Sequence, residues 1–530
     1  MSGKPSMIAS NNSGHTIGID VGSSGIRFLL LNTMGKMIND RIVTYKTLEA
    51  QKHRIWDEEK KINLENLTET IETQLILLIK EDPEIVVASL SFSGIGPSLV
   101  LLSKQAKPLV HAFTYAYQGA QDYVNSLPLN YQERTGSQHS GAIPYVQLLK
   151  LKDEEILKSC FKITTINDYL TWNMTDIPLT NIFSSVPNAS YTGLYSLKHQ
   201  YWDIQLLQEI GLSTSILPKI VPLGAIFPIK KTLKRVSSTF KDTSIIAGAI
   251  DGIDAFWATG VDTEDIIVGS ASSTGALRRI RKTPKTEYGS QLIQCCQIDK
   301  GTWVELIPFN NVGTSFTWIA NNFRDTFRGY LSNNQLNIKK LEGNLLSKFD
   351  DKIKDLESYL LNLPLFFPYV EGEPRGPKGR GRIKGGFIFQ EGPVPCYDLY
   401  FSLVLGVVNM YRHNLEVLNP NSKCQEIRLT GLIAQKSPLF LRLLASSVKK
   451  SIVIMKTEQS IAWASGMRAL TYVNIRKNMP KVSLLESIPP ENKEIQECLS
   501  VLYKKYLEVY NEPDNYQIIQ SEEEINLSVN

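Results

Sequence analysis

Cysteine is scarce in this sequence, and its spacing argues against a metal or redox site. The 530 residues include six cysteines, none of them in a CxxC pair. A disulfide framework would need more cysteines for a chain of this length, and zinc sites usually bring cysteines closer together. Cys295 and Cys296 lie in the apolar stretch QLIQCCQI. We therefore expect a strand there, with both thiols buried.

The sequence also lacks a dominant charge and a long apolar run. Its formal net charge is +4, and the charged residues, 21% of the chain, have both signs interspersed. A nucleic-acid-binding domain normally gathers basic residues on one face, so we expect no nucleic-acid partner. The most apolar run, residues 360–370, contains two prolines and is too short to span a bilayer. The first residues lack the apolar core of a signal peptide, and we expect a cytoplasmic protein without a membrane partner.

What the sequence does contain is typical of a globular protein of two large domains. Hydrophobic residues make up 42% of the chain, and this length predicts two large domains or three smaller ones. We place a mobile polar tail at 1–14, a first domain at 15–255, a second domain at 256–475, and a helical extension with a polar tail at 476–530. The sequence leaves homodimer formation open.

Apolar periodicity predicts a similar order of strands and helices in both halves. In the first half, three strands across 16–45 precede a helix at 64–80 and a strand at 84–94. Residues 145–220 are expected to be mainly helical. Strands are predicted again within 243–280, at EIRLTG and at SIVIMK, with helices near 316–323, 398–418, 437–448 and 495–510. The pattern favours an α/β protein with ligands at the ends of strands.

The stretch HTIGIDVGSSGIRFLLLN contains the first candidate site. An apolar strand runs into Asp20, turns on Gly22, Ser23 and Ser24, and leaves through Arg27. The turn fits neither the Walker loop nor the dinucleotide fingerprint, but its backbone N–H groups and hydroxyls suit phosphate oxygens. Asp20 would repel a phosphate unless Mg²⁺ or water lay between them. The alternative is an ordinary hairpin with a capping aspartate.

Two further stretches carry candidate chemistry. The turn GSASSTG at 269–275 follows an apolar strand and offers a second set of phosphate donors, although such turns are also common loops. Asp251 lies beside a glycine, just before an apolar helix. It either caps that helix or acts as a general base toward an attacking hydroxyl.

Together, these motifs resemble the FGGY carbohydrate kinase family, and they do so over most of the chain. DVGSSGIR resembles the first phosphate motif, SFSGIGPSLVLLS the sugar-contacting strand and turn, and NASYTGLYSLKHQYWD the central signature. GAIDGIDAFWATG with SSTGALR is closest to the gluconate and xylulose kinase branches. FNNVGTSFTW, PYVEGEPRGPKGRGRIKGGF and LTGLIAQKSPLFLRLLASS match the second-domain motifs in order.

The resemblance implies an α/β fold of two actin/hexokinase-like (ribonuclease H-like) domains around a central cleft. It implies phosphorylation of a hydroxyl of a sugar, sugar acid or polyol, with ATP and Mg²⁺ as cofactors. Asp251 is then the catalytic base and contacts the substrate, and Asp20 holds Mg²⁺ through water. The other implied residues are Gly22, Ser23, Ser24, Arg27, Ser273, Thr274 and Gly275 at the phosphates, Asn311, Gly313 and Gly431 at the nucleotide, and Ser93, Gly94 and Tyr117 at the substrate.

The sequence departs from the family pattern at the sugar site. The motif W-x-D-x-R reads Tyr115-Ala-Tyr117-Gln-Gly119, without either charged residue, and Gly96-Pro97 replaces a histidine or polar contact. The loss of Asp and Arg argues against an ordinary sugar or sugar-acid specificity.

The nucleotide side departs from the pattern as well. The phosphate turn Gly-Thr-Ser-Gly reads Ser-Ser-Thr-Gly at 272–275, and Leu432 and Trp463 occupy positions that are usually glycine. Bulky residues there indicate altered or lost ATP binding. The basic segment GEPRGPKGRGRIKGG either meets an anionic group or is a solvated loop. The alternative to an active kinase is therefore a catalytically impaired pseudokinase that binds a ligand or a partner.

Overall fold

The structure is a computed structural model of the chain. It describes residues 14–80, 85–236, 238–284, 293–343, 356–370, 385–388, 394–421, 423–455, 461–473 and 484–521. Most of the predicted N-terminal tail, nearly all of the basic glycine-rich segment and the end of the polar tail lie outside the described residues.

The first half of the chain is organised around a six-stranded sheet with the order β12-β13-β4-β1-β2-β3. Its elements are β1 (His15–Val21), β2 (Gly25–Leu31), β3 (Met37–Thr44), α1 (Tyr45–Ala50), α2 (Leu64–Lys80), β4 (Val87–Gly94), β12 (Ile226–Pro228) and β13 (Ser244–Ile250). Strand β4 lies between β1 and β13, parallel to both, and all eight of its residues are buried. The apolar face of α2 belongs to the same core as this sheet. The predicted strands and helix of this region are confirmed.

The middle of the chain combines short helices with short strands. Its elements are β5 (Ser98–Leu102), β6 (Phe113–Thr114), α3 (Tyr131–Thr135), α4 (Pro144–Leu151), α5 (Glu155–Lys158), β7 (Lys162–Thr164), α6 (Ile166–Asn173), β8 (Phe183–Ser185), α7 (Val186–Ser190), β9 (Tyr195–Ser196), β10 (Tyr201–Trp202), α8 (Ile204–Glu209), β11 (Lys219–Val221) and α9 (Lys231–Val236). The expectation of a mainly helical region is thus only partly correct. Strands of two or three residues are too short to produce a visible alternation in the sequence.

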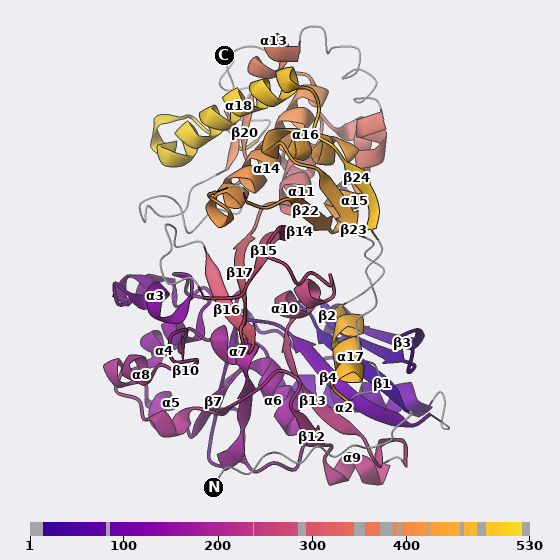
Figure 1. Cartoon of the computed structure of the whole chain (residues 1–530), viewed down its shortest axis with the longest axis vertical. Coiled ribbons are helices and arrows are strands. Elements are labelled where there is room, and N and C mark those ends of the chain that lie inside the picture. Colours follow the sequence, from indigo (N-terminus) through magenta and orange to yellow (C-terminus); the bar gives the residue numbers. More distant parts are fainter. Residues whose placement is uncertain are drawn as a thin grey trace.

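The second half is organised around a seven-stranded sheet with the order β16-β17-β15-β14-β22-β23-β24. Its elements are α10 (Asp251–Trp257), β14 (Ile266–Ala271), β15 (Gly275–Arg281), β16 (Gln294–Asp299), β17 (Thr302–Phe309), α11 (Gly313–Asn322), β18 (Leu331–Ser332), β19 (Gln335–Leu336), α13 (Leu356–Leu361), β20 (Leu365–Phe367), β21 (Gly386–Ile388), α14 (Cys396–Leu418), β22 (Glu426–Thr430), α15 (Leu432–Lys436), α16 (Pro438–Val448), β23 (Ile452–Met455), α17 (Ile461–Tyr472), β24 (Leu484–Ile488) and α18 (Lys493–Asn511). Helices α14, α16 and α18 pack together on this side of the molecule (Figure 1).

Strand β16 also joins the two halves. The backbone N–H of Cys295 donates to the carbonyl of Gly136 at 2.7 Å, and the Gln132 amide donates to the carbonyl of Ile293 at 2.8 Å. Both cysteines of this strand are fully buried, as predicted. The second sheet is therefore tied to the first half through its edge strand.

Helix α17 returns from the second half to the first sheet, where it lies beside β1 and β4 (Figure 1). A Cβ on Gly18 would lie 1.9 Å from the carbonyl oxygen of Ala462, so only glycine permits this close approach of helix and strand. Trp463 packs among Leu29 and Leu31, and its indole N–H donates to the carbonyl of Gly35 at 3.0 Å. A helix within the predicted second-domain range thus packs on the first sheet, and the predicted domain boundaries stay a prediction.

Within the described ranges, no helix is both long enough and apolar enough to cross a membrane.

Candidate active site

Two aspartates that are far apart in the sequence meet at the ends of neighbouring strands. Asp20 lies on β1 opposite Ser93 of β4, and β13, on the other side of β4, leads directly into Asp251. Burial, followed by the negative charge of Asp251, raises the pKa of Asp20 to about 7, and Arg27 opposes this shift. Asp20 and Asp251 are close enough for the charge of one to shift the pKa of the other. The structure therefore brings together the predicted metal residue and the predicted base.

Asp251 is the first residue of α10, and Ile250 occupies the N-cap position. Its Oδ1 accepts the backbone N–H of Gly252 at 2.6 Å. Burial raises the pKa of Asp251 to about 6, although this hydrogen bond and the positive charge of Arg278 act in the opposite direction. The carboxylate thus satisfies one free N–H group of the first helical turn, and its Oδ2 forms no hydrogen bond within the described chain. One oxygen is left to accept a proton.

The first turn, residues 22–24, has its serines exposed between β1 and β2. Its geometry is fixed by the N–H of Gly22, which donates to the carbonyl of Gly25 at 3.0 Å. Arg27 lies opposite Asp20 in the strand register, and its Nη2 donates to Asp40 at 3.0 Å. In this structure, Arg27 is therefore close to the first turn but engaged in an ion pair.

The predicted substrate residues lie in different surroundings. The Ser93 side chain is fully buried and forms no hydrogen bond within the described chain, and Gly94 backs onto Asn167. Tyr117, however, packs edge-on against Phe113, with ring centroids 5.0 Å apart. Its hydroxyl faces Lys150. Tyr117 therefore belongs to an aromatic core and is not brought together with Asp251.

Tyr115 is the tyrosine of this segment that lies near Asp251. It is 43% exposed, and its pKa is raised by burial and by the charge of Asp251, while Ser23 acts in the opposite direction. Sequence reasoning quoted Tyr115 only as a departure from the family motif. Its neighbours show that it lies between the first turn and the predicted base.

The second turn, residues 272–274, is exposed between β14 and β15 and packs on the start of α11. The N–H of Gly313 donates to the Ser272 carbonyl at 2.8 Å, and a Cβ on Gly313 would lie 2.7 Å from that oxygen. Asn311, fully buried, has a left-handed φ of 68°. The start of a helix beside an exposed turn of serines is a common place for an anion to bind, but here the N–H groups of Gly313 and Thr314 already donate to carbonyl oxygens of the turn.

A cavity of about 850 Å³ opens beside this second turn, and its size suits a nucleotide. Ser272, Ser273 and Gly313 line it, together with Leu432, whose side chain is 52% exposed. Gly431 comes just before Leu432, with a φ of 105° and a backbone so close to Ala271 that a Cβ would lie 2.4 Å from its carbonyl oxygen. Of the two bulky departures, Leu432 lies at this cavity, and Trp463 is buried against the first sheet.

Sequence reasoning missed Arg278, the last residue of the quoted motif SSTGALR. It lies on β15 near Asp251, and its Nη2 would be 3.4 Å from a Cβ on Gly252. Its Nε is occluded and forms no hydrogen bond within the described residues. The sequence signal that could have identified Arg278 was an arginine shortly after the second turn, which resembles a phosphate-binding turn.

A buried ion pair that the sequence did not reveal holds helix α10 against helix α17. Arg468 of α17 and Asp254 of α10 form an ion pair, and both side chains are fully buried. The Arg468 Nη2 also donates to the Ser91 hydroxyl at 2.9 Å and to the Phe92 carbonyl at 3.1 Å. Because Asp254 is one helical turn from Asp251, this pair fixes the helix that carries the predicted base.

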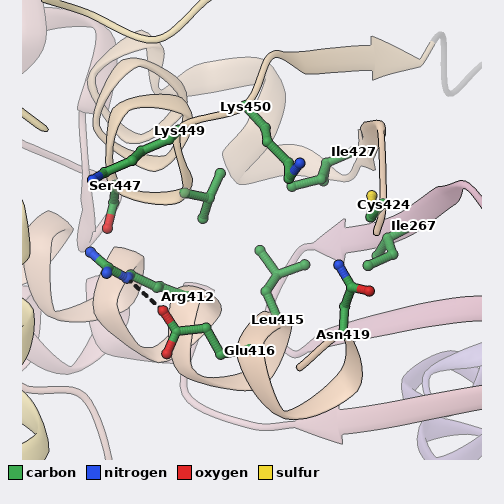
Figure 2. Close-up of a pocket in the computed structure, with 11 residues that line it drawn as sticks. Ile267, Arg412, Leu415, Glu416, Asn419, Cys424, Ile427, Ser447, Lys449 and Lys450 are labelled. Atoms are coloured by element: carbon green, nitrogen blue, oxygen red, sulfur yellow. Dashed lines mark hydrogen bonds and ion pairs between the residues drawn. The ribbon is translucent and has the colours of Figure 1, made fainter. Parts of the chain in front are cut away.

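A second cavity, of about 210 Å³, lies apart from these residues, between the C-terminal ends of α14 and α16 and the second sheet (Figure 2). Arg412 and Glu416, which line it, form an ion pair 2.9 Å apart. No predicted site residue lines it. The large cavity at the second turn is therefore the candidate nucleotide site.

Comparison with known proteins finds similarity to carbohydrate kinases. Residues 15–256 match the model described as the FGGY family of carbohydrate kinases, N-terminal domain. The gluconokinase of Bacillus subtilis (strain 168) is 23% identical over 381 residues, which cover 70% of this chain and 71% of that protein. The xylulose kinase of Staphylococcus xylosus is 20% identical over 468 residues, covering 86% and 90%.

Solved structures show the same architecture. The gluconate kinase from Lactobacillus acidophilus superposes with a TM-score of 0.79 at 21% identity, covering 94% of this chain and 98% of that one. The ligand-bound xylulose kinase from the same organism gives 0.78, with the same identity and coverage. The predicted α/β fold of two actin/hexokinase-like domains is confirmed.

Proposed function

Since the chain belongs to the FGGY family of carbohydrate kinases, we propose that it catalyses ATP-dependent phosphorylation of a hydroxyl group on a sugar, sugar acid or polyol. The observation that carries this proposal is the juxtaposition of Asp20 and Asp251 beside the first turn. A cytoplasmic location stays a prediction. Homodimer formation stays a prediction.

Asp251 acts as the general base in this proposal. Its free Oδ2 takes the proton of the acceptor hydroxyl. At the same time the hydroxyl oxygen of the acceptor bonds to the γ-phosphorus of ATP. The bond between the γ-phosphorus and the bridging oxygen breaks, and ADP leaves. Such transfer depends on in-line positioning and charge neutralisation more than on covalent chemistry. A pKa of about 6 keeps Asp251 ionised at neutral pH, yet basic enough to accept a proton.

Asp20 is the residue suited to hold Mg²⁺. Its Oδ1 is buried without a hydrogen-bond partner in the described chain, and it lies close to a second carboxylate. Two carboxylates in one site favour a divalent cation. Among the described residues, no group of three or more His, Cys, Asp or Glu side chains could hold a metal. The protein would therefore supply few of the ligands of Mg²⁺. Asp20 would supply a carboxylate, and water and phosphate oxygens would complete the set. When bound, Mg²⁺ neutralises phosphate charge.

Asp20 should make stability depend on pH in the absence of Mg²⁺. Its pKa is raised from 3.8 to about 7, so the folded state is favoured while the group is protonated, and this contribution is lost as pH rises toward 7. We expect Asp20→Asn to leave the melting temperature nearly unchanged at pH 4 and to raise it at pH 8. Differential scanning fluorimetry across this range measures the effect.

Asp57→Asn is the control for this prediction, because the stability contribution of Asp57 depends on pH in the opposite direction. The pKa of Asp57 is lowered by its hydrogen bonds to the Lys61 backbone and to His111, so it stabilises the fold at high pH and this stabilisation is lost as pH falls. Asp57→Asn should therefore lower the melting temperature at pH 8. An Asp20→Asn protein that is less stable than wild type at pH 8 would contradict the buried environment assigned to Asp20.

Leu432 should weaken nucleotide binding without preventing it. Its exposed side chain occupies part of the cavity beside the second turn. We expect Leu432→Ala to lower the Kd of MgATP by about 3- to 10-fold, which corresponds to about 1 kcal/mol. Trp463 should not be altered at the same time, since large-to-small changes in a core cost about 3–5 kcal/mol. Isothermal titration calorimetry compares the variant with Leu485→Ala, an exposed leucine on β24. Unchanged binding would show that the nucleotide avoids Leu432.

Calorimetry of the wild-type protein tests the proposed function itself. MgATP is titrated at millimolar concentration, with and without sugars, sugar acids and polyols. Nucleotide binding that is strengthened by one class of acceptor supports the kinase. If no nucleotide binds under any condition, the kinase proposal is rejected and the chain is a pseudokinase.

A further inference from the structure

We infer that Arg278 binds a carboxylate of the acceptor, so that the protein acts on a polyhydroxy acid and not on a neutral sugar or polyol. This inference rests on the proposed function, because it assigns the acceptor side of the same site. It also revises the sequence analysis, in which the charged residues missing at 115–119 argued against a sugar acid.

Arg278, which is partly exposed, differs from the buried and partly buried arginines with which it can be compared. The adjacent Arg279 donates to Glu305 at 2.7 Å and to Asn419 at 3.0 Å. Arg134 donates to Asp203 at 2.6 Å and 2.9 Å, and Arg468 pairs with Asp254. In contrast, Arg278 forms no hydrogen bond and has no carboxylate within 4.0 Å in the part of the chain that the structure describes.

Among the described residues, the surroundings of Arg278 provide no negative charge that pairs with it. Asp251 is close enough to influence its pKa but is not an ion-pair partner. The neighbouring phenols, Tyr191 and Tyr411, are both buried with raised pKa values and therefore remain neutral. The Tyr411 hydroxyl already donates to the Ser270 carbonyl at 2.6 Å. Arg278 is only partly exposed and its Nε is occluded, so an anionic ligand would supply the partner that the described residues do not.

The position of Arg278 favours the acceptor over the phosphates as the source of this anion. It lies three residues along β15 from Gly275, at the end of the second turn. An extended strand rises about 3.3 Å per residue, which places Arg278 roughly 10 Å from that turn. Its guanidinium instead reaches Gly252, beside the predicted base. A planar carboxylate matches the two-pronged geometry of guanidinium donors.

The proposed acceptor therefore spans the space between two side chains. Asp251 faces the hydroxyl that receives the phosphoryl group, and Arg278 holds the carboxylate elsewhere on the same molecule. Tyr115, at the first turn, borders the hydroxyl end. In the complex with ATP and acceptor, Asp251 then accepts a hydrogen bond from the acceptor hydroxyl, and Arg278 pairs with the acceptor carboxylate.

Binding of D-gluconate, D-xylonate and their neutral counterparts D-glucitol and D-xylitol tests this assignment. Calorimetry is carried out on the wild type, Arg278→Gln, Arg278→Lys and the control Arg281→Gln, which alters an arginine of the same strand that has its own acidic neighbours. We expect the wild type to prefer an acid to its neutral counterpart. Arg278→Gln should weaken acid binding by about 30- to 100-fold, with a smaller loss for Arg278→Lys and none for Arg281→Gln.

Kinetics distinguish the acceptor from the transferred phosphoryl group. We expect Arg278→Gln to raise the KM for the acid while the KM for ATP changes less than about twofold. An equal loss of kcat with every acceptor, or a raised KM for ATP, would assign Arg278 to the phosphoryl group and overturn the inference. So would a wild-type protein that binds no acid, or one that binds neutral polyols better.

The two proposals can fail separately. Acid binding that depends on Arg278 but gives no phosphorylated product would support the inference and reject the kinase. Phosphorylation of neutral polyols by wild type and Arg278→Gln alike would support the kinase and reject the inference. Unchanged thermal melting of Arg278→Gln shows that its losses come from binding and not from unfolding.

Discussion

Replacing Asp251 by asparagine is expected to lower kcat by about 10²–10⁴-fold, the contribution of a general base. Asparagine keeps the shape of the side chain and can still accept the Gly252 N–H, so α10 should remain intact. It cannot take the proton of the acceptor at neutral pH. The measurement is acceptor-dependent release of ADP, together with calorimetric binding of MgATP, which should be nearly unchanged.

Asp262→Asn is the matched control for this loss. Asp262 is exposed, in the segment that follows α10, and is not part of the site. Its substitution should leave kcat unchanged. Full activity of Asp251→Asn would place the base elsewhere, or show that the activity came from a contaminating enzyme.

Removing one partner of the buried pair between Arg468 and Asp254 should cost about 3–5 kcal/mol of unfolding free energy. Both side chains are fully buried, so Arg468→Leu would leave the charge of Asp254 uncompensated in the core. The Ser91 hydroxyl and the Phe92 carbonyl would also lose a donor. Urea denaturation followed by tryptophan fluorescence measures the loss.

The double variant Asp254→Leu with Arg468→Leu separates the charge from its packing. Replacing a whole buried pair by apolar residues is often neutral or stabilising, so the double variant should regain most of the lost stability. Because Asp254 lies one turn from Asp251, we expect activity to return with it. A single variant as stable as wild type would show that the pair is not buried.

The parts of the fold that the sequence predicts are those set by local periodicity. The alternation around Asp20 and the apolar spacing of α2 mark elements that form from neighbouring residues, and both occur as expected. The two- and three-residue strands of the middle region lack such a signal. The return of α17 to the first sheet depends on Gly18 meeting Ala462 and Gly466, a contact between distant segments that no local pattern contains.

The site was predictable to a similar extent. Motif resemblance named both Asp20 and Asp251, and the structure brings them together. It could not predict that Tyr117 packs against Phe113 while Tyr115 lies near Asp251, because these placements depend on tertiary packing. It also could not predict that Trp463 would turn away from the nucleotide cavity, since only tertiary packing determines the direction of that side chain.

The sequence signal for Arg278 gave no indication of the surroundings of its side chain. An arginine within a strand usually has a carboxylate partner or faces solvent. Only the three-dimensional structure shows that Arg278 lies next to Asp251 without such a partner.

The central claim is that this protein transfers a phosphoryl group from ATP to a small polyhydroxylated acceptor. Mass spectrometry of reactions with MgATP and an acceptor panel tests it most directly, with wild type and Asp251→Asn compared under the same conditions. The account predicts a phosphorylated acceptor in equal amount to ADP with the wild type, and at most a trace with Asp251→Asn. No phosphorylated acceptor with any member of the panel, or equal amounts from both proteins, would contradict it.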